Sequence, residues 1–122
     1  RLVNLDLSQN GLKFLDKDVF SSLMRLSHLF LSKNKLIYIK QGTFSAQKRL
    51  LYLDLRENQL NSISSSIISE LPSLKILYIS MNPLFCNELL KSIVNSCGKE
   101  NIIEVPNSGN PCILSDLNLN CT

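Results

Sequence analysis

The sequence predicts an α/β solenoid in which stacked coils share one parallel sheet, and three observations indicate this fold class. First, one phrase returns in a fixed 24-residue register: LVNLDLSQNGL begins at Leu2, LSHLFLSKNKL at Leu26, LLYLDLRENQL at Leu50 and LKILYISMNPL at Leu74. A fixed period of this size is typical of repeat proteins whose units stack on one another. Second, each phrase alternates apolar and polar residues. Third, each phrase carries an asparagine at the same place.

The alternation predicts one half-buried strand in each coil, since side chains of a strand point to opposite faces in turn. Stacked in parallel, the four strands bring the inward residues into two buried columns. These columns are Leu5, Leu29, Leu53 and Leu77, then Leu7, Leu31, Leu55 and Ile79.

The asparagines stand where each predicted strand turns away from the sheet. Backbone N–H and C=O groups that leave a ladder inside an apolar wall need other partners, and an amide side chain both donates and accepts. We therefore predict a structural asparagine ladder that bonds neighbouring coils. Its members are Asn10, Asn34, Asn58 and Asn82.

The return path of each coil is expected to carry its own apolar layer. Phe20 and Phe44 occupy the same repeat position, and Ile68 takes it in the third coil. These side chains predict a packing spine on the convex side. Gln47 interrupts the layer in the second coil, so we expect a looser return segment there.

The last third of the chain changes character. NELLKSIVNSCG, from Asn87, has an apolar stripe at helical spacing and predicts a helix across the open end of the fourth coil. All four cysteines lie here, which favours two disulfides over a zinc site, since no CxxC pair occurs. A helix from Glu88 to Cys97 is about 13 Å long, too long for a Cys86–Cys97 bridge. The other two connectivities stay open.

These motifs resemble the leucine-rich repeat family in its 24-residue extracellular form, LxxLxLxxNxLxxLxxxxFxxLxx. The resemblance covers residues 2–84 and implies a horseshoe with a parallel concave sheet. Residues 82–86, NPLFC, resemble the NPxxC that opens a disulfide-bonded C-terminal cap in Toll-like receptor ectodomains, lamprey variable lymphocyte receptors and neuronal adhesion proteins. We thus expect repeats over 1–84 and a cap with one helix over 85–122.

The resemblance bears on only part of the disulfide pattern. Most such caps open with CxC, whereas this one has Cys86 followed by Asn87 and Glu88, and Cys97 comes later. We expect bridges Cys86–Cys112 and Cys97–Cys121, and the family's pattern speaks only to the bond of Cys86.

Composition limits the function classes. The chain of 122 residues is 44% hydrophobic and 19% charged with a net charge of +3, which is ordinary for a globular domain. No apolar run approaches the roughly 18 residues of a membrane span, and no leader is visible. No cap shields Leu2, so we expect the C-terminal piece of a longer ectodomain; the alternative is that a partner or second copy covers this face.

The outward residues of the strands predict a binding surface on the concave face. Asp6, Asp54 and the serines are ordinary polar fillers, whereas other outward positions hold aromatic, aliphatic or basic side chains. Exposed apolar groups mark protein contacts, although aromatics on neighbouring strands also stabilise a sheet by packing. The candidate surface comprises His28, Phe30, Tyr52, Arg56, Ile76, Tyr78 and Met81.

Enzyme and polyanion functions find less support. His28 lies near Asp6 and Asp54 on the predicted sheet, but an open sheet excludes no water, so we expect no enzyme and no cofactor or metal. The second coil carries five basic residues and no acidic one, a pattern of a solvated face that would also attract polyanions. The basic residues form no continuous stripe, so nucleic acid is not expected. Asn120-Cys121-Thr122 is a candidate N-glycosylation sequon.

Together these features predict a secreted or cell-surface recognition module. We expect a protein ligand or co-receptor, a homo- or heterodimer as a further possibility of assembly, and no membrane segment in this chain. The resemblance implies innate immune recognition or receptor signalling as the context. The alternative is a structural capping segment of a cell-adhesion or matrix protein whose ligand binds elsewhere.

Overall fold

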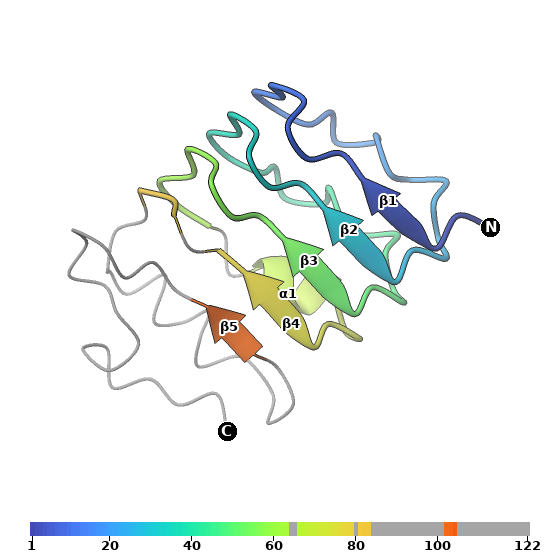
Figure 1. Cartoon of the computed structure of the whole chain (residues 1–122). Coiled ribbons are helices and arrows are strands. Elements are labelled where there is room, and N and C mark those ends of the chain that lie inside the picture. Colours follow the sequence, from blue (N-terminus) through green and yellow to red (C-terminus); the bar gives the residue numbers. More distant parts are fainter. Residues whose placement is uncertain (64–65, 80, 84–101, 105–122) are drawn as a thin grey trace.

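Five short parallel strands form one sheet in the computed structural model, which describes residues 1–63, 66–79, 81–83 and 102–104. The strands follow one another across the sheet in chain order (Figure 1), as expected when each coil lies directly on the previous one. This confirms the predicted solenoid with a parallel sheet. The strands are β1 Asn4–Asp6, β2 His28–Phe30, β3 Tyr52–Asp54, β4 Ile76–Tyr78 and β5 Ile102–Glu104.

The register of the sheet follows the repeat period. Leu5 pairs with Leu29, Leu29 with Leu53, and Leu53 with Leu77, so the inward leucines stack in one column. In the three inner coils this column is buried completely or nearly so. Burying a leucine stabilises a fold by about 2 kcal/mol, so each added coil extends one continuous core.

The fifth strand lies in the segment 85–122, which the sequence predicted as a cap with one helix. Ile76 pairs with Ile102, Leu77 with Ile103 and Tyr78 with Glu104. The residues that pair between β4 and β5 are slightly more than 24 positions apart in the sequence. The 24-residue repeat, which predicted the other four strands, therefore did not predict β5. The predicted cap helix, the cysteines and Asn120 lie outside the described residues.

The convex side carries the return segments and the short helix α1 Ser66–Glu70, which lies behind the sheet (Figure 1). Phe20 and Phe44 are buried there and their rings stack with centroids 6.0 Å apart. The aromatic packing spine is therefore present in the first two coils. In the third coil Ile67 and Leu71 are buried in the same core, whereas the side chain of Ile68 is outside the described part of the chain.

The expectation of a looser return segment at Gln47 is wrong. The side chain is completely buried, and its Nε2 donates to the carbonyl oxygens of Phe20 at 2.7 Å and Leu23 at 3.1 Å. The amide thus bonds two backbone carbonyls of the preceding coil, adding a second donor at Phe20 beside the N–H of Leu23. A polar residue in the apolar layer here joins two coils instead of separating them.

A carboxylate makes a second connection on this side. Glu70, at the end of α1, accepts the backbone N–H of Gly42 at 2.8 Å and of Phe44 at 3.2 Å. Hydrogen bonds to an ionised acceptor are stronger than neutral ones. Glu70 therefore connects the third coil to the turn at Gly42–Phe44, where the convex segment of the second coil begins.

A left-handed residue follows each of the first four strands. Backbone φ is 59° at Gln9, 57° at Lys33, 56° at Glu57 and 60° at Met81, all at one repeat position. This conformation is unfavourable for residues other than glycine and asparagine, and it turns the chain sharply out of the sheet. The asparagine comes directly after it in each coil.

Each interior asparagine bonds two coils. Asn58 Nδ2 donates to the carbonyl oxygens of Leu31 and Leu55, both at 3.0 Å, and its Oδ1 accepts the N–H of Leu36 at 3.1 Å. Asn34 and Asn82 repeat this geometry toward the coils before them. Asn10 is exposed, and its Nδ2 donates to carbonyl oxygens of its own turn.

Candidate functional site

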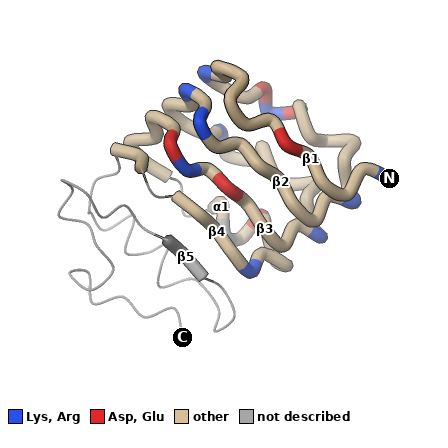
Figure 2. Tube along the Cα trace, viewed as in Figure 1, with Lys and Arg blue, Asp and Glu red and all other residues tan. Residues whose placement is uncertain are grey.

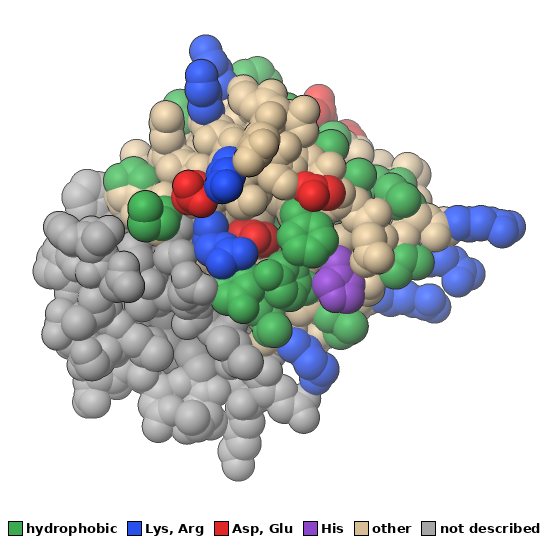
Figure 3. All heavy atoms as spheres, viewed as in Figure 1, with side chains coloured by type: hydrophobic (Ala, Val, Ile, Leu, Met, Phe, Trp, Pro, Cys, Tyr) green, Lys and Arg blue, Asp and Glu red, His purple; other side chains and the backbone are tan. Residues whose placement is uncertain are grey.

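The concave face of the sheet carries the predicted binding residues in two columns. The register places Asn4, His28, Tyr52 and Ile76 side by side, and next to them Asp6, Phe30, Asp54 and Tyr78. Strands β2 and β4 have no acidic, lysine or arginine residue, so charge gathers at strand ends and turns (Figure 2). In the space-filling view the purple histidine adjoins a green apolar group at the centre of this face (Figure 3).

Four aromatic rings form one continuous cluster across β2, β3 and β4. Tyr52 is its centre, with ring centroids 5.6 Å from His28, 5.2 Å from Phe30 and 5.3 Å from Tyr78. His28 and Phe30 also face each other at 6.4 Å. All four side chains are half-buried, so part of each remains accessible to solvent. Aromatic pairs at these separations stabilise one another by about 0.5–1.5 kcal/mol.

A buried carboxylate and an arginine close one end of this cluster. Asp54 is only 3% exposed and accepts from Arg56 Nε at 3.0 Å and Nη2 at 2.8 Å, a two-pronged pair. The guanidinium lies over the ring of Tyr78, with Cζ 4.3 Å from the centroid. Asp54 is therefore no ordinary surface filler, because it orients Arg56 against the aromatic cluster.

The environment of Tyr52 changes its acidity. Burial raises the pKa of the Tyr52 hydroxyl above 10.0, and the negative charge of Asp54 raises it further. A hydrogen bond with Tyr78 acts on this pKa in the same direction. Tyr52 is thus a neutral phenol at physiological pH, and its hydroxyl bonds that of Tyr78 within an otherwise apolar group.

The remaining predicted residues lie at the margins of the aromatic cluster. Ile76 is half-buried on β4 beside Tyr52 in the register. Met81 is 55% exposed, but it stands in the left-handed turn after β4, in the column of Gln9, Lys33 and Glu57, and not on the sheet. The predicted set therefore divides into six residues on or next to the strands and one in a turn.

Sequence reasoning missed the partner of His28. Its Nδ1 lies 2.8 Å from the hydroxyl of Ser27, the preceding residue, and its ring is held between Phe30 and Tyr52. Asp6, a neighbour of His28 in the predicted sheet, instead accepts the N–H and hydroxyl of Ser8. The hydroxyl and backbone N–H of Ser8 lower the pKa of Asp6. The contacts of His28 are those of a packed ring.

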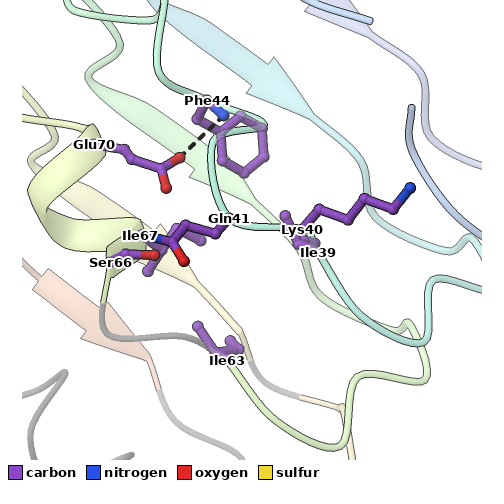
Figure 4. A pocket seen from close by; sticks show the side chains of 8 residues that line it. All are labelled: Ile39, Lys40, Gln41, Phe44, Ile63, Ser66, Ile67 and Glu70. Atoms are coloured by element: carbon purple, nitrogen blue, oxygen red, sulfur yellow. Dashed lines mark hydrogen bonds between the residues drawn. The ribbon is translucent and has the colours of Figure 1, made fainter. Parts of the chain in front are cut away.

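A small pocket lies on the opposite, convex side, between α1 and the second coil (Figure 4). Its walls include Ile39, Phe44, Ile63 and Ile67, and Glu70 points across it to the backbone of Phe44 (Figure 4). With a volume of ≈ 10 Å³ it has room for about one water molecule. Such a space is a packing feature and not a ligand pocket.

Metal and membrane features are absent from the part of the chain that the structure describes. Its residues include no group of three or more histidine, cysteine or acidic side chains placed to hold a metal ion. The helix α1 is short, and within the described ranges no helix has the length and apolar character of a bilayer span.

Known structures share this arrangement of coils. The leucine-rich repeat domain of APL1B matches 87% of the chain with a TM-score of 0.68 and 19% identity, and human 5T4, a trophoblast glycoprotein, matches 98% with 0.66 and 25%. TLR13 in its complex with ssRNA13 matches 86% with 0.58 and 19%. The chain spans 31%, 45% and 19% of those three chains.

Sequence comparison gives the family. No curated protein matches the chain significantly at the sequence level. The model of the leucine-rich repeat family matches residues 1–46 and 37–84, which together make up more than half of the chain. The chain belongs to the leucine-rich repeat family.

Proposed function

We propose that the chain is an extracellular protein-recognition module that binds a protein ligand or co-receptor through the aromatic cluster on its concave face. The observation that carries this proposal is the continuous row of half-exposed rings from His28 to Tyr78, closed by Arg56. Tyrosine and arginine are among the residues that most often dominate protein interfaces. The rings need no ordering on binding, because their neighbours already hold them.

The chemistry of this face favours a protein over a nucleic acid. The two described concave columns contain no lysine or arginine, and the charge of the nearby Arg56 is paired with Asp54. A nucleic-acid surface requires a cationic path along the phosphates, and the described concave strands supply none. The TLR13 structure contains ssRNA, but that is a property of TLR13, whose likeness to this chain extends to the fold.

The wider setting is part of the same proposal. We infer a place at the C-terminal part of a larger ectodomain, outside the cell, in innate immune recognition or receptor signalling. The 24-residue register and four cysteines in the final third support an oxidising compartment. The likeness to human 5T4, over 98% of this chain, is consistent with it.

The competing function is structural, with the rings acting only to stabilise the sheet and the ligand binding elsewhere. The four ring contacts favour it as well. The two functions differ in what a substitution changes. Packing depends on the ring bodies, whereas recognition also depends on the hydroxyls and on the guanidinium.

The test is a binding screen of the chain, displayed as a multimer, against an array of cell-surface and secreted ectodomains. The triple variant Phe30→Ser/Tyr52→Ser/Tyr78→Ser is expected to lose the captured partner, while Met24→Ser, at a side chain 62% exposed, keeps it. Tyr52→Phe keeps the ring packing and is expected to weaken binding with little change in stability, whereas Arg56→Lys keeps the charge but loses the two-pronged pair with Asp54, so its unfolding is measured alongside its binding. Loss of stability with partner binding unchanged defeats the proposal.

A further inference from the structure

A second exposed apolar surface lies on the flank of the first two coils, where the chain passes from the sheet to the convex side. Phe14 is 66% exposed, Ile37 46% and Tyr38 47%. Leu15, directly after Phe14, and Leu36, directly before Ile37, are both buried. The exposed side chains therefore stand next to core residues and face outward. Large apolar side chains grouped on a surface indicate a contact site.

These three residues belong to adjacent coils, at the same point of the return path. Phe14 and Tyr38 stand at the same position of successive repeats. The N–H of Ile37 donates to the carbonyl oxygen of Lys13 at 3.4 Å, and that of Lys35 to Leu12 at 2.7 Å. The two backbone segments therefore run side by side, and we refer to Phe14, Ile37 and Tyr38 as the flank patch.

The charges around the flank patch are mostly positive. Lys13, Lys35 and Lys40 are exposed, and none of the three pairs with a carboxylate in the described part of the chain. Asp16 and Asp18 are the acidic residues on the same stretch of the first coil, with Lys17 between them. The third coil carries Asn61 and Ser62 where the first two carry the patch, so the surface ends there.

We propose that the flank patch docks an acidic segment of a partner protein that carries an apolar or aromatic side chain. The apolar side chain packs on Ile37 and the two rings, and carboxylates beside it meet Lys13, Lys35 and Lys40. Charge complementarity of this kind sets orientation and speeds association. The docking surface is separate from the concave cluster, because the left-handed turn at Lys33 lies between them.

The same charges argue against two other occupants. A second copy of the chain in a symmetric dimer places the patch against itself and brings lysines of like charge together. A nucleic acid binds chiefly through a run of phosphates, whereas here the apolar residues lie among the lysines and Asp16 adds an opposing charge. A mixed acidic and apolar peptide satisfies both kinds of group at once.

The test uses the whole chain and short fluorescent peptides of matched length, measured by anisotropy. One peptide alternates glutamate with leucine and phenylalanine, a second replaces its glutamates by lysine, and a third replaces its apolar residues by serine. We expect only the first to bind. Phe14→Ser/Tyr38→Ser and Lys35→Glu/Lys40→Glu are each expected to weaken that binding by about tenfold or more.

Two controls locate the site. The concave triple variant, Phe30→Ser/Tyr52→Ser/Tyr78→Ser, is expected to bind the first peptide as the parent chain does, whether or not its own ligand is lost. Hydrogen exchange with peptide bound is expected to slow at residues 12–14 and 35–40. Far-ultraviolet circular dichroism of both flank variants checks that they remain folded, as expected for exposed positions.

Several results overturn the proposal. Equal binding of the serine-substituted peptide, or of heparin and polyuridylate at the same salt, means a polyanion surface instead. Binding that persists in the folded Phe14→Ser/Tyr38→Ser variant removes the patch from the site. Concentration-dependent dimerisation of the chain that these substitutions abolish identifies a second copy as the occupant.

Discussion

The first coil and the third carry nearly the same phrase, LVNLDLSQNGL and LLYLDLRENQL, yet the structure treats them differently. Leu53, Leu55 and Leu60 of the third coil are completely buried, whereas Leu5, Leu7 and Leu12 are half-buried. Asn58 Nδ2 and Oδ1 bond two coils, while Asn10 Nδ2 bonds its own. The stabilisation that a motif residue provides therefore comes from the neighbouring coil as much as from the motif, as nearest-neighbour models of repeat proteins require.

The largest difference is expected in the leucine column. Leu53→Ala removes a fully buried side chain and leaves a cavity, so unfolding free energy should fall by about 3–4 kcal/mol. Leu5→Ala, at the edge of the same column, should cost about 1–2 kcal/mol. Urea denaturation of both variants checks this, and equal costs at the two positions would contradict the role of the neighbouring coil.

The asparagines give the second contrast. Asn58→Ala removes the acceptor of the Leu36 N–H and one of the two amide donors at each of the carbonyl oxygens of Leu31 and Leu55, so we expect a loss of about 2–3 kcal/mol. Asn10→Ala should cost less than about 1 kcal/mol, since its bonds are exposed. Asn58→Asp keeps the shape and removes the donors, so a stability near that of Asn58→Ala indicates that the donors matter most.

The left-handed turns provide a case in which the two coils should behave alike. Backbone φ is 59° at Gln9 and 56° at Glu57, and a β-branched residue tolerates this region poorly. Gln9→Val and Glu57→Val are each expected to cost about 1–2 kcal/mol in thermal unfolding, with Gln9→Asn and Glu57→Asn close to the parent. A much smaller cost at Gln9 would mean that the first turn changes conformation.

The smallest expected effect concerns Asp6, the aspartate that follows the inward Leu5. The hydroxyl and backbone N–H of Ser8 lower the pKa of Asp6 below 3.8. A lowered pKa in the folded state means that the carboxylate stabilises the fold above pH 3.8 and that this contribution disappears as the pH falls through the folded pKa. Carbon-detected NMR titration should give a midpoint for Asp6 below 3.8 that Ser8→Ala moves upward.

The period predicted those parts of the molecule that every coil shares. The strand positions, their register and the two concave columns all follow from one repeated shift along the sequence, because parallel coils place equivalent residues side by side. The burial of Leu53, for example, can be predicted from its position in the repeat alone. The fold class was accessible from sequence for this reason.

The features that occur once were not predicted. Gln47 and Glu70 bond backbone groups of a neighbouring coil, and neither belongs to the motif. Asp54 looked like surface filler because the motif tolerates aspartate there, and only the arginine two positions later makes it a buried partner. The strand β5 pairs with β4 outside the repeat register. Non-periodic contacts of this kind leave no pattern in a single sequence.

The asparagine bonds have a direction along the chain. Asn34, Asn58 and Asn82 each reach back to the coil before them, so the turn of one coil is completed by an amide that belongs to the next. Because a ribosome synthesises the chain from its N-terminus, the side chain that bonds the N–H groups of a turn is always made after that turn. Removal of the following coil would therefore leave the N–H groups of a turn without their side-chain acceptor.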